Sequence, residues 1–476
     1  MSFFYRFGIA RSAPRLPTPK PVALAVSAML LSGCASFSPD GGMDAVSAMT
    51  RERTGQAIER IPAASDAAAL DARIDQLLVQ PLTADTAVRI ALINNRGLQA
   101  SLSELGVAEA DFVQAGRMRN PSVSFGRLRG GDDIEIERSI MFDLAGLLTL
   151  PLRRDIEGRR FEQAKLQAAE HAVKLATDTR RAYFNAVAAQ QTAQYMEQVK
   201  DAAEAGAELA QGMAKAGNWS KLDQAREQAF HADATAQLAR ARQNAVAARE
   251  QLTRVLGLWG KRTEYKLPDR LPDLPPEPAE AGNIEARALQ QRLDVQMARR
   301  DAEATASALG LTRTTGFINV FDAGYRNKSQ TGAPRSNGYQ IELELPLFDW
   351  SGAKTARAEA VYMQSVHRTA DIAVRARSEA REAYSAYRTS YDLARHYRDE
   401  VVPLRKKISE EMQLRYNGML VSVFDLLADA RAQIGSVNAA IEAQRDFWLA
   451  DTDLQQAILG SGGASRELRA PAAATE

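Results

Sequence analysis

The sequence is poor in the residues that most often carry chemistry. Its 476 residues include one cysteine, which excludes a disulfide within the chain, and four histidines that share no metal-ligand spacing. Sixty basic and 59 acidic residues mix throughout and give a net charge of +1, so no basic face indicates nucleic acid and no acidic block indicates a disordered tail. After the N-terminal region no stretch reaches the roughly eighteen consecutive apolar residues of a transmembrane helix. The length allows two or three domains with a sizeable core.

The single cysteine follows an export signal. The apolar stretch VALAVSAMLL comes after four basic residues, Arg6, Arg11, Arg15 and Lys20, which is the order of a secretory signal, and it is too short to span a bilayer permanently. It runs into Leu31-Ser32-Gly33-Cys34, which resembles the lipobox of bacterial lipoproteins. This resemblance implies cleavage before Cys34, a diacylglycerol and palmitate anchor on that residue and, because residue 35 is Ala, export to the outer membrane. The alternative is an inert free cysteine.

The remaining sequence contains a duplicated pattern. LTLPLRRDIEG at 148–158 returns as LELPLFDWSG at 343–352, so that Leu148 and Leu343 are 195 residues apart, and both phrases read as strands. Ala91-Leu92 and Ala288-Leu289 correspond at an offset of 197, within helical patterns that begin near Thr83 and residue 284. Thr83 is expected to cap the first of these helices. A Pro-rich linker at 261–282 separates the two copies.

Each helical pattern leads into two strand-like stretches. In the second half apolar residues alternate with polar ones, which is the period of a two-faced strand: Tyr339, Ile341, Leu343, Leu345 and Leu347. Its expected partner is GFINVFDAGYR at 316–326, and the loop between them is NKSQTGAPRSNG. The first half has PSVSFGRLR, then GGDD, then IEIERSIMFDL running towards Pro151. The sequence therefore predicts two hairpins.

A long Ala-rich helical run follows each hairpin, over 153 to about 216 and 353 to about 416. At 1.5 Å per residue, such a run makes a rod of about 96 Å. The composition suits a narrow buried seam and is equally typical of a soluble coiled coil. Pro403 predicts a kink in the second rod. Each rod ends near a glycine, Gly217 or Gly418, and S-x-x-D pairs are expected to cap the returning helices: Ser220 with Asp223 and Ser422 with Asp425.

Four strands leave two open sheet edges. In hydrocarbon an unpaired edge has no water to bond, so membrane strands close into barrels of roughly eight or more. Four strands from one chain therefore predict an oligomer, with eight strands from two chains or twelve from three.

The order and duplication of these phrases resemble the TolC-type outer-membrane efflux protein family, in its lipid-anchored branch. The resemblance covers roughly residues 82–460 and includes NPSVSF at 120–125 and a pattern in the first helical segment: Leu82, Thr83, Ala87, Ala91, Leu92, Asn94, Asn95, Leu98 and Ala100. In the first half Arg153-Arg154-Asp155 departs from the family's Phe-Asp. The resemblance implies an α+β membrane protein with a duplicated helix, β-hairpin, long helix and helix repeat. It also implies a homotrimer whose twelve-stranded outer-membrane β-barrel continues as a periplasmic α-helical coiled-coil barrel.

On this interpretation the chain divides into six parts. These are a signal peptide (1–33), a lipidated N-terminal segment (34–81), a first efflux-channel repeat (82–260), the Pro-rich linker (261–282), a second repeat (283–461) and a flexible C-terminal tail (462–476).

The implied function is passive conduction of small molecules or ions from periplasm to exterior, when the channel is docked to a periplasmic adaptor protein and an inner-membrane efflux pump. No nucleophile–base pair, phosphate loop or ligand cluster occurs in the sequence, so we expect no enzyme activity, no cofactor beyond the lipid anchor, no metal site and no nucleic-acid partner. The expected location is the bacterial outer membrane, with extension into the periplasm. Drugs, heavy-metal ions and polypeptides remain open as cargo.

Particular residues follow from the resemblance. Asp425 matches one of two aspartates that surround the periplasmic aperture in the family. The position of the second aspartate falls on Ala428 here, and Asp429 follows one residue later, so Asp425 and Asp429 are the gate candidates. Capping of a helix alone is the competing interpretation of Asp425. Gly217, Asn218, Asn417 and Gly418 are candidates for adaptor contact, and Phe348 and Trp350 for the membrane interface.

Two other functions remain open. A periplasmic adaptor or structural coiled-coil lipoprotein would carry one long hairpin followed by β domains, whereas this chain repeats its helices. A polypeptide-secretion exit duct of the same family is the other alternative, and a lipid-anchored enzyme is the least favoured.

Overall fold

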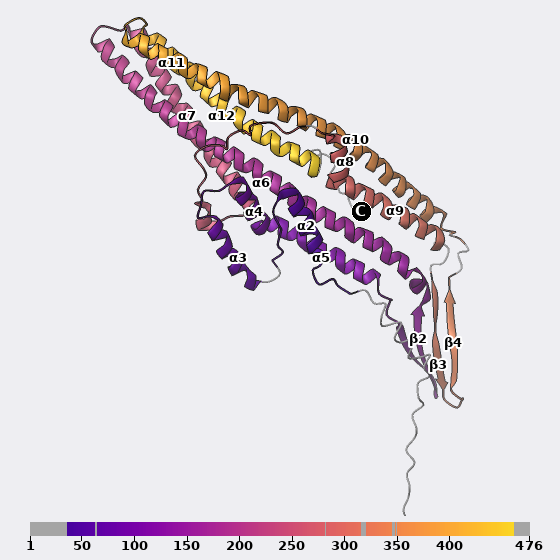
Figure 1. Ribbon diagram of the computed structural model, residues 1–476. Helices are drawn as coiled ribbons and strands as arrows, with labels where there is room; N and C mark the ends of the chain where they lie inside the picture. The colour runs from indigo at the N-terminus through magenta and orange to yellow at the C-terminus, as the bar shows by residue number, and fades with distance from the viewer. Residues whose placement is uncertain are drawn as a thin grey trace, which may run out of the picture.

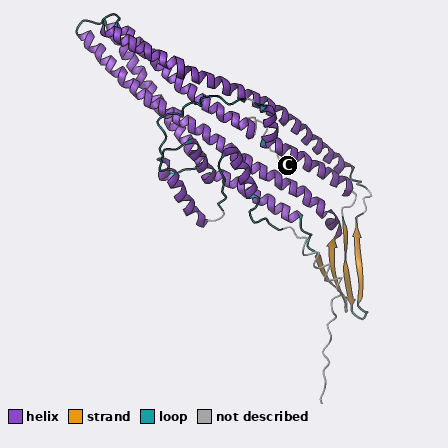
Figure 2. Cartoon of the chain, viewed as in Figure 1, coloured by secondary structure: helices purple, strands orange, loops and turns teal. Residues whose placement is uncertain are grey.

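The protein is an elongated helical body with a small sheet at one end (Figures 1 and 2). The computed structural model describes residues 36–61, 64–280, 282–315, 320–344, 348 and 350–460. Cys34, Leu345, Pro346 and Leu347 lie outside these ranges, so the predicted lipid anchor and the end of the LELPL phrase are not described. None of the helices in the described ranges has the length and apolar character needed to cross a membrane.

Both halves of the chain contain the expected order of elements. Two N-terminal helices, α2 (Met43–Thr54) and α3 (Ala64–Leu77), come first. The first half then consists of α4 (Ala84–Asn94), α5 (Arg96–Ala115), β1 (Ser122–Gly130), β2 (Asp133–Asp143), α6 (Leu144–Lys215) and α7 (Lys221–Leu256). After a short 3-10 turn, η1 (Gly260–Thr263), the second half consists of α8 (Ile284–Gln291), α9 (Leu293–Thr315), β3 (Phe321–Gln330), β4 (Ser336–Leu343), α10 (Gly352–His396), η2 (Tyr397–Val401), α11 (Val402–Asn417) and α12 (Val423–Leu459).

The long helix α6 begins earlier than predicted. It runs for 72 residues from Leu144, about 108 Å at 1.5 Å per residue, so LTLPLRRDIEG is helical and the strand prediction for it is wrong. The Asp143 side chain caps the helix by accepting a hydrogen bond from Gly146 N at 2.5 Å. Leucine is a strong helix former, and Pro151 lies in the second turn, where it removes a single backbone hydrogen bond. Three alternating leucines were too short a pattern to distinguish a strand from a helix.

The second rod is interrupted where proline predicted a disturbance. Helix α10 ends at His396, a π-helical segment covers Tyr397–Val401, and α11 begins at Val402 with Pro403 in its first turn. Because proline has no N–H to donate, the local hydrogen-bond ladder changes its spacing just before it. The first rod has no such segment.

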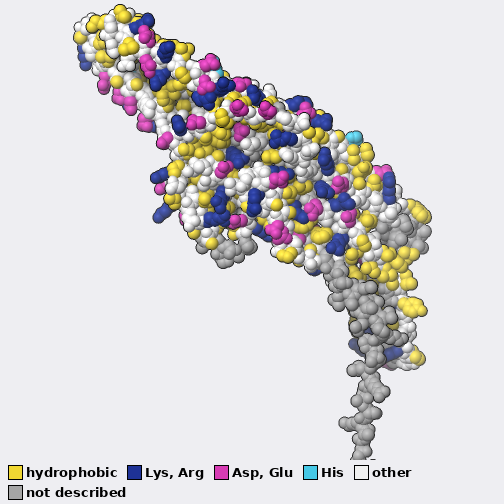
Figure 3. Space-filling view, viewed as in Figure 1, with side chains coloured by type: hydrophobic (Ala, Val, Ile, Leu, Met, Phe, Trp, Pro, Cys, Tyr) yellow, Lys and Arg dark blue, Asp and Glu magenta, His cyan; other side chains and the backbone are white. Residues whose placement is uncertain are grey.

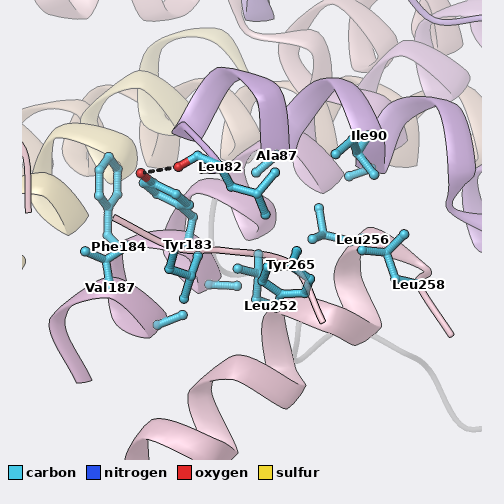
Figure 4. Packing of buried hydrophobic residues seen from close by; sticks show 14 of the residues in the cluster. Leu82, Ala87, Ile90, Tyr183, Phe184, Val187, Leu252, Leu256, Leu258 and Tyr265 are labelled. Carbon is cyan, nitrogen blue, oxygen red and sulfur yellow. Dashed lines mark hydrogen bonds between the residues drawn. The ribbon is translucent and has the colours of Figure 1, made fainter. Parts of the chain in front are cut away.

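The middle of the molecule contains the largest buried core (Figure 4). Leu82, Ile90 and Tyr183 pack there with Leu252 and Leu256 of α7, and the Tyr183 hydroxyl donates to the Leu82 carbonyl at 3.0 Å. The core joins α4, the middle of α6 and the end of α7, which lie far apart in sequence. It holds the first repeat together at the level where the rod is thickest (Figure 1).

The Pro-rich linker connects the two halves and packs against helices of both. After η1, which includes its first three residues, the described part of the linker has no regular element, but side chains of other segments donate hydrogen bonds to its carbonyl groups. Gln444 and Trp448 of α12 both donate to Pro272 O, at 2.7 and 3.0 Å, and Tyr391 of α10 donates to Pro276 O at 2.9 Å. Leu271 of the linker is buried in the central core. These bonds replace the backbone partners that a proline-rich segment cannot provide for itself.

In both halves, a side chain at the junction of the two short helices donates a hydrogen bond to the C-terminal part of the returning helix, but the donor residue differs. In the first half Asn94 donates from the α4–α5 junction to Leu256 O and Gly257 O at the end of α7, at 3.0 and 2.8 Å. In the second half Arg292, at the α8–α9 junction, points its Nη1 towards Ala457 O near the end of α12 at 3.5 Å. A donor at each junction therefore satisfies carbonyl groups at a helix C-terminus.

Candidate functional site

The sheet is a four-stranded antiparallel meander in the order β1-β2-β3-β4. β1 pairs with β2 and β3 with β4 as the two predicted hairpins, and β2 pairs with β3 to join the repeats. Strand lengths of 8 to 11 residues are close to the 9–11 residues of a tilted membrane strand. Within the described chain β1 and β4 each pair on one side only, so both outer edges of the sheet are open.

One face of the sheet is apolar. Directly opposed residues point to the same face, and the register aligns one row across all four strands: Val123, Ile140, Tyr325 and Tyr339. Tyr339 is 91% exposed and Val123 is 75% exposed, although both are large apolar or aromatic side chains. Phe142, Ala323 and Ile341 form the next row on this face. Hydrophobic side chains are correspondingly visible over the strands in Figure 3.

The opposite face is polar and charged. Ser124 and Ser139 hydrogen-bond at 2.7 Å across β1 and β2. Glu137 pairs with Arg326 at 2.7 Å, and Lys328 pairs with Glu135, across β2 and β3. The sheet therefore has the two different faces that the alternation at 339–347 predicted, over the part of that stretch that is described.

Polar side chains that do reach the apolar face are hydrogen-bonded. Arg138 donates to Asn327 Oδ1 at 3.0 Å, and Asn327 donates to Asn337 Oδ1 at 2.5 Å. The Arg138 guanidinium also lies 6.0 Å from the centre of the Phe125 ring. This row limits the purely apolar part of the face to the half of the strands nearest the helices.

Phe348 and Trp350 lie between β4 and α10, at the helical end of the sheet. Phe348 is 100% exposed and Trp350 is 74% exposed. Aromatic side chains without a packing partner at the base of an apolar face are typical of a membrane interface. Their assignment as interface residues stays a prediction.

The two turns at the far end of the molecule are equivalent at an offset of 202. In both, a residue with positive φ follows the helix, Gly217 at +78° and Met419 at +59°. The next N–H donates to the carbonyl five residues back, at 2.9 Å in the first turn and 2.8 Å in the second. Gly418, for which the sequence suggested this role, has φ of −79° and lies one residue earlier. Met419 therefore occupies the left-handed position that Gly217 occupies in the first turn.

Apolar side chains are exposed at these turns. Met419 is 93% exposed, Leu420 78% and Leu222, at the start of α7, 61%; we call these three residues the tip patch. Trp219 of the first turn stacks on Phe424 of α12, with ring centres 4.6 Å apart, so the two turns lie together. Sequence reasoning chose Gly217, Asn218, Asn417 and Gly418 and missed the tip patch. The offset of 202 at Ser422 and Asp425 is the signal that could have found it.

The capping pairs are present in both turns. Ser422 Oγ donates to Asp425 Oδ2 at 2.7 Å and accepts from Asp425 N at 3.3 Å, and Ser220 and Asp223 make the matching side-chain bond at 2.6 Å. Hydrogen bonds from the Ser422 hydroxyl and N–H hold the pKa of the exposed Asp425 carboxyl below its ordinary value.

Asp429 lies one turn beyond Asp425 on the same side of α12. It is partly buried, and its Oδ2 atom has no hydrogen-bond partner in the described structure. Ala428, beside it, is exposed. The two gate candidates thus differ. The Asp425 carboxylate accepts hydrogen bonds from Ser422, whereas the Asp429 Oδ2 atom accepts none in the described structure. Their role in a gate stays a prediction.

An ion pair with a buried carboxylate connects α7 to α12 a few turns from the tip. Glu227 is 3% exposed, and its Oε1 atom accepts from Arg431 Nη2 at 2.7 Å. The Arg431 guanidinium also lies 4.3 Å from the Phe230 ring centre. No local pattern in the sequence indicates this pair, because its members are 204 residues apart.

No group of three or more potential metal ligands occurs in the part of the chain that the structure describes. The polar residues of the sheet and of the two turns make hydrogen bonds, helix caps and ion pairs with one another. The site that the geometry presents is therefore a set of surfaces, a two-faced open sheet at one end and a paired turn at the other.

Comparisons with known proteins agree with this geometry. No protein-family model matches the chain. The cobalt-zinc-cadmium resistance protein CzcC of Cupriavidus metallidurans is 25% identical over 288 residues, which is 56% of this chain and 64% of that relative, less than two thirds of its length. The solved structure of CusC, a protein that forms a transmembrane channel, matches with a TM-score of 0.66 and 17% identity over 80% of this chain and 92% of CusC. The outer membrane protein VceC of Vibrio cholerae matches with a TM-score of 0.65 and 15% identity, over 83% and 97% of the two chains.

These matches show that the chain shares the fold of CusC and VceC over at least 80% of its length. The resemblance that the sequence suggested is therefore confirmed, and the chain has the fold of the TolC-type outer-membrane efflux proteins.

Proposed function

We propose that the protein is the outer-membrane channel of a tripartite efflux system and conducts small molecules or ions passively from the periplasm to the exterior. The observation that carries the proposal is the open four-stranded sheet with one apolar and one polar face, attached to a helical body about 100 Å long. An apolar face suits lipid, and a polar face suits a water-filled lumen. The fold of CusC and VceC supports the same conclusion.

The open edges call for other copies of the chain. β1 and β4 present unpaired backbone groups that hydrocarbon does not tolerate, and pairing β4 of one copy with β1 of the next would close the sheet. We propose a homotrimer with twelve strands, continued by a coiled-coil tunnel built from the long helix pairs. Cys34 would carry the lipid anchor in the outer membrane, while the helical body would extend into the periplasm.

Electron microscopy of the detergent-extracted full-length protein tests the assembly. A three-fold particle with a barrel joined to a tunnel of about 100 Å is the expected result. Conductance across planar bilayers should accompany it. A slender monomer without conductance would favour the periplasmic adaptor or structural lipoprotein and would withdraw the channel.

Asp425 and Asp429 are the proposed gate. In a trimer, copies of one helix surface gather at the three-fold axis, where a ring of carboxylates attracts cations and repels anions. Asparagine at both positions removes the charge but keeps an acceptor for Ser422, so the cap of α12 is retained. We expect Asp425→Asn with Asp429→Asn to raise conductance and lower cation selectivity.

Asp223→Asn is the matched control, because Asp223 makes the same cap on α7. Unchanged conductance and selectivity in the double variant would show that Asp425 acts only as a cap. An equal change in the control would assign the effect to the turn rather than to a gate.

The tip patch is the proposed contact for a periplasmic adaptor. Leu222, Met419 and Leu420 are apolar and exposed at the end farthest from the sheet, where nothing in the described chain covers them. Replacing all three with Glu should abolish efflux in cells while purified trimers still conduct. Leu209→Glu, on a 48% exposed leucine of α6, is the control. Efflux at the parental rate in the triple variant would refute tip docking.

Metal cations are the first cargo to test, because the curated relative is a cobalt-zinc-cadmium resistance protein. Growth of a deletion strain in Co²⁺, Zn²⁺ or Cd²⁺, with and without the gene, measures this directly. Restored resistance supports metal cargo, whereas resistance restored only to organic drugs would assign the channel to drug efflux.

A further inference from the structure

A cavity of about 590 Å³ lies where the helices meet the sheet. Its walls come from the C-terminal end of α5, the segment that follows it, the first turns of α6 and the C-terminal part of α9. Arg119, on the wall, is three residues before β1, and α6 begins directly after β2. In Figure 1 these helix ends lie beside the strands. No part of the proposed conduction or docking uses this cavity.

Four arginines and two acidic residues line the cavity: Arg117, Arg119, Arg153, Arg160, Asp111 and Glu157. Only one arginine is closely paired within the lining, since Arg160 Nη1 is 2.6 Å from Glu157 Oε1. Arg119 Nε is 3.6 Å from Asp143 Oδ2, and that carboxylate already caps α6. The cavity therefore has more positive charge than its own carboxylates neutralise.

Two of the guanidinium groups have no carboxylate partner among the described residues. Across the described ranges, neither Arg117 nor Arg153 has a carboxylate oxygen within 4.0 Å. Arg153 donates from Nη2 to Gly146 O at 2.7 Å, while its Nε atom is buried and has no hydrogen-bond partner. Burying a charged group whose hydrogen-bonding capacity is not filled is costly, so an anion beside the guanidinium would stabilise its charge.

The rest of the lining is mostly apolar, with Gln114 and Thr312 as its two uncharged polar residues. Met118 is 41% exposed and faces the cavity together with Ile156 and Leu311. A fully hydrated ion would gain nothing from such a wall, whereas a molecule with an anionic head and a hydrocarbon part would contact both kinds of surface. The apolar face of the sheet starts, at the helical end of the strands, with the row of Phe321 and Leu343.

We propose that this cavity binds the phosphate of an anionic phospholipid in the leaflet that faces the helical body. Guanidinium groups bind phosphate oxygens through paired, charge-assisted hydrogen bonds, and basic pockets at membrane depth bind acidic headgroups. Arg117 and Arg153 supply the free donors, and the apolar wall contacts the start of the acyl chains. The proposal rests on the membrane placement of the strands under the proposed function, but not on conduction, gating or adaptor docking.

Lipid binding to the full-length trimer in detergent tests the site. The probes are phosphatidylglycerol, phosphatidylcholine and inorganic phosphate, with bound lipid counted by native mass spectrometry. Phosphatidylglycerol should bind most tightly, and Arg117→Gln with Arg153→Gln should weaken it at least about tenfold, because two charge-assisted bonds are lost. Arg240→Gln with Arg254→Gln, two exposed arginines of α7, should leave binding unchanged.

Equal affinity in the parent and the double variant would overturn the proposal. Displacement of the lipid by millimolar inorganic phosphate would also overturn it, by assigning the site to a soluble anion. If the double variant does not assemble, Arg117→Gln alone, an exposed side chain, should still weaken binding several-fold. Conductance of the same preparations separates the two proposals. Conducting channels without a preference for phosphatidylglycerol refute the lipid site alone, and preparations that never insert refute the membrane placement.

Discussion

Gly324 lies where the two repeats approach each other closely in the sheet. It lies in β3 opposite Met141 of β2, and a Cβ atom built on it would lie 2.0 Å from the carbonyl oxygen of Ile140 and 2.5 Å from Met141 Sδ. Real Cβ atoms do not approach other atoms closer than 3.0 Å, so Gly324→Ala requires β2 and β3 to separate locally by about 1 Å. Unlike a flexible side chain, the carbonyl cannot move without moving its strand.

The energetic consequence follows from hydrogen-bond length. Adding 1 Å to a ladder bond of about 2.9 Å takes it beyond bonding distance, and at least the two bonds nearest to residue 324 would be affected. Each buried backbone group that loses its partner costs about 1–3 kcal/mol, and more where lipid replaces water. We therefore expect Gly324→Ala to destabilise the sheet by roughly 2–6 kcal/mol.

Thermal unfolding of the detergent-purified protein and conductance in planar bilayers measure the effect. Gly338→Ala in β4 is the matched control, since a Cβ atom there meets nothing within 4 Å. Gly324→Ala should lower the unfolding midpoint and the yield of conducting channels, and Gly338→Ala should change neither. The same midpoint and channel yield in both variants would refute the β2–β3 contact and the reasoning built on it.

Three further predictions concern the helical body. Arg292→Met should lower the free energy of unfolding by roughly 3 kcal/mol, because the buried Arg292 is paired with the carboxylates of Asp294 and Glu379 at 2.6 and 2.7 Å. Arg299→Met, on the exposed side of α9, should have little effect in the same unfolding assay. Because the pKa of Asp425 is lowered in the folded protein, its ionised carboxylate stabilises α12 fully above the ordinary pKa of 3.8, and this stabilisation is lost as the pH falls through the lower folded value. Hydrogen exchange at the start of α12, corrected for intrinsic rates, should therefore rise in that pH range. Ser422→Ala should remove most of this pH dependence. Met419→Gly should stabilise its turn by about 1 kcal/mol, since the left-handed φ of +59° is strained for methionine, and slower exchange of the adjacent amide would show it.

Local patterns were sufficient where one element decides its own structure. Thr83, Ser220 and Ser422 cap helices as predicted, because a cap needs only a side-chain acceptor and an N–H three residues later. Alternation in 339–343 predicted a two-faced strand, and the loop composition predicted the hairpins. Pro403 predicted a disturbed helix because its ring leaves the backbone nitrogen without a hydrogen to donate.

Predictions failed where a short pattern was ambiguous. Leu148, Leu150 and Leu152 alternate as in a strand, yet they lie in α6, because Asp143 starts the helix before them. Gly418 matches the glycine expected after a helix, but the turn places Met419 in the left-handed conformation. In each case the hydrogen bonds around the phrase, and not its composition, determine the backbone.

The sequence by itself determined the duplicated order of helices and hairpins, the caps and the resemblance to outer-membrane efflux proteins, because each depends on periodicity or on residues a few positions apart. Tertiary structure alone decided which distant groups meet. It pairs Glu227 with Arg431, joins β2 to β3 at Gly324 and leaves Leu222 and Leu420 exposed. It also leaves Arg153, on the wall of the cavity, without a carboxylate partner among the described residues. Such contacts depend on the packing of segments that are as much as 204 residues apart, and no local pattern in the sequence specifies them.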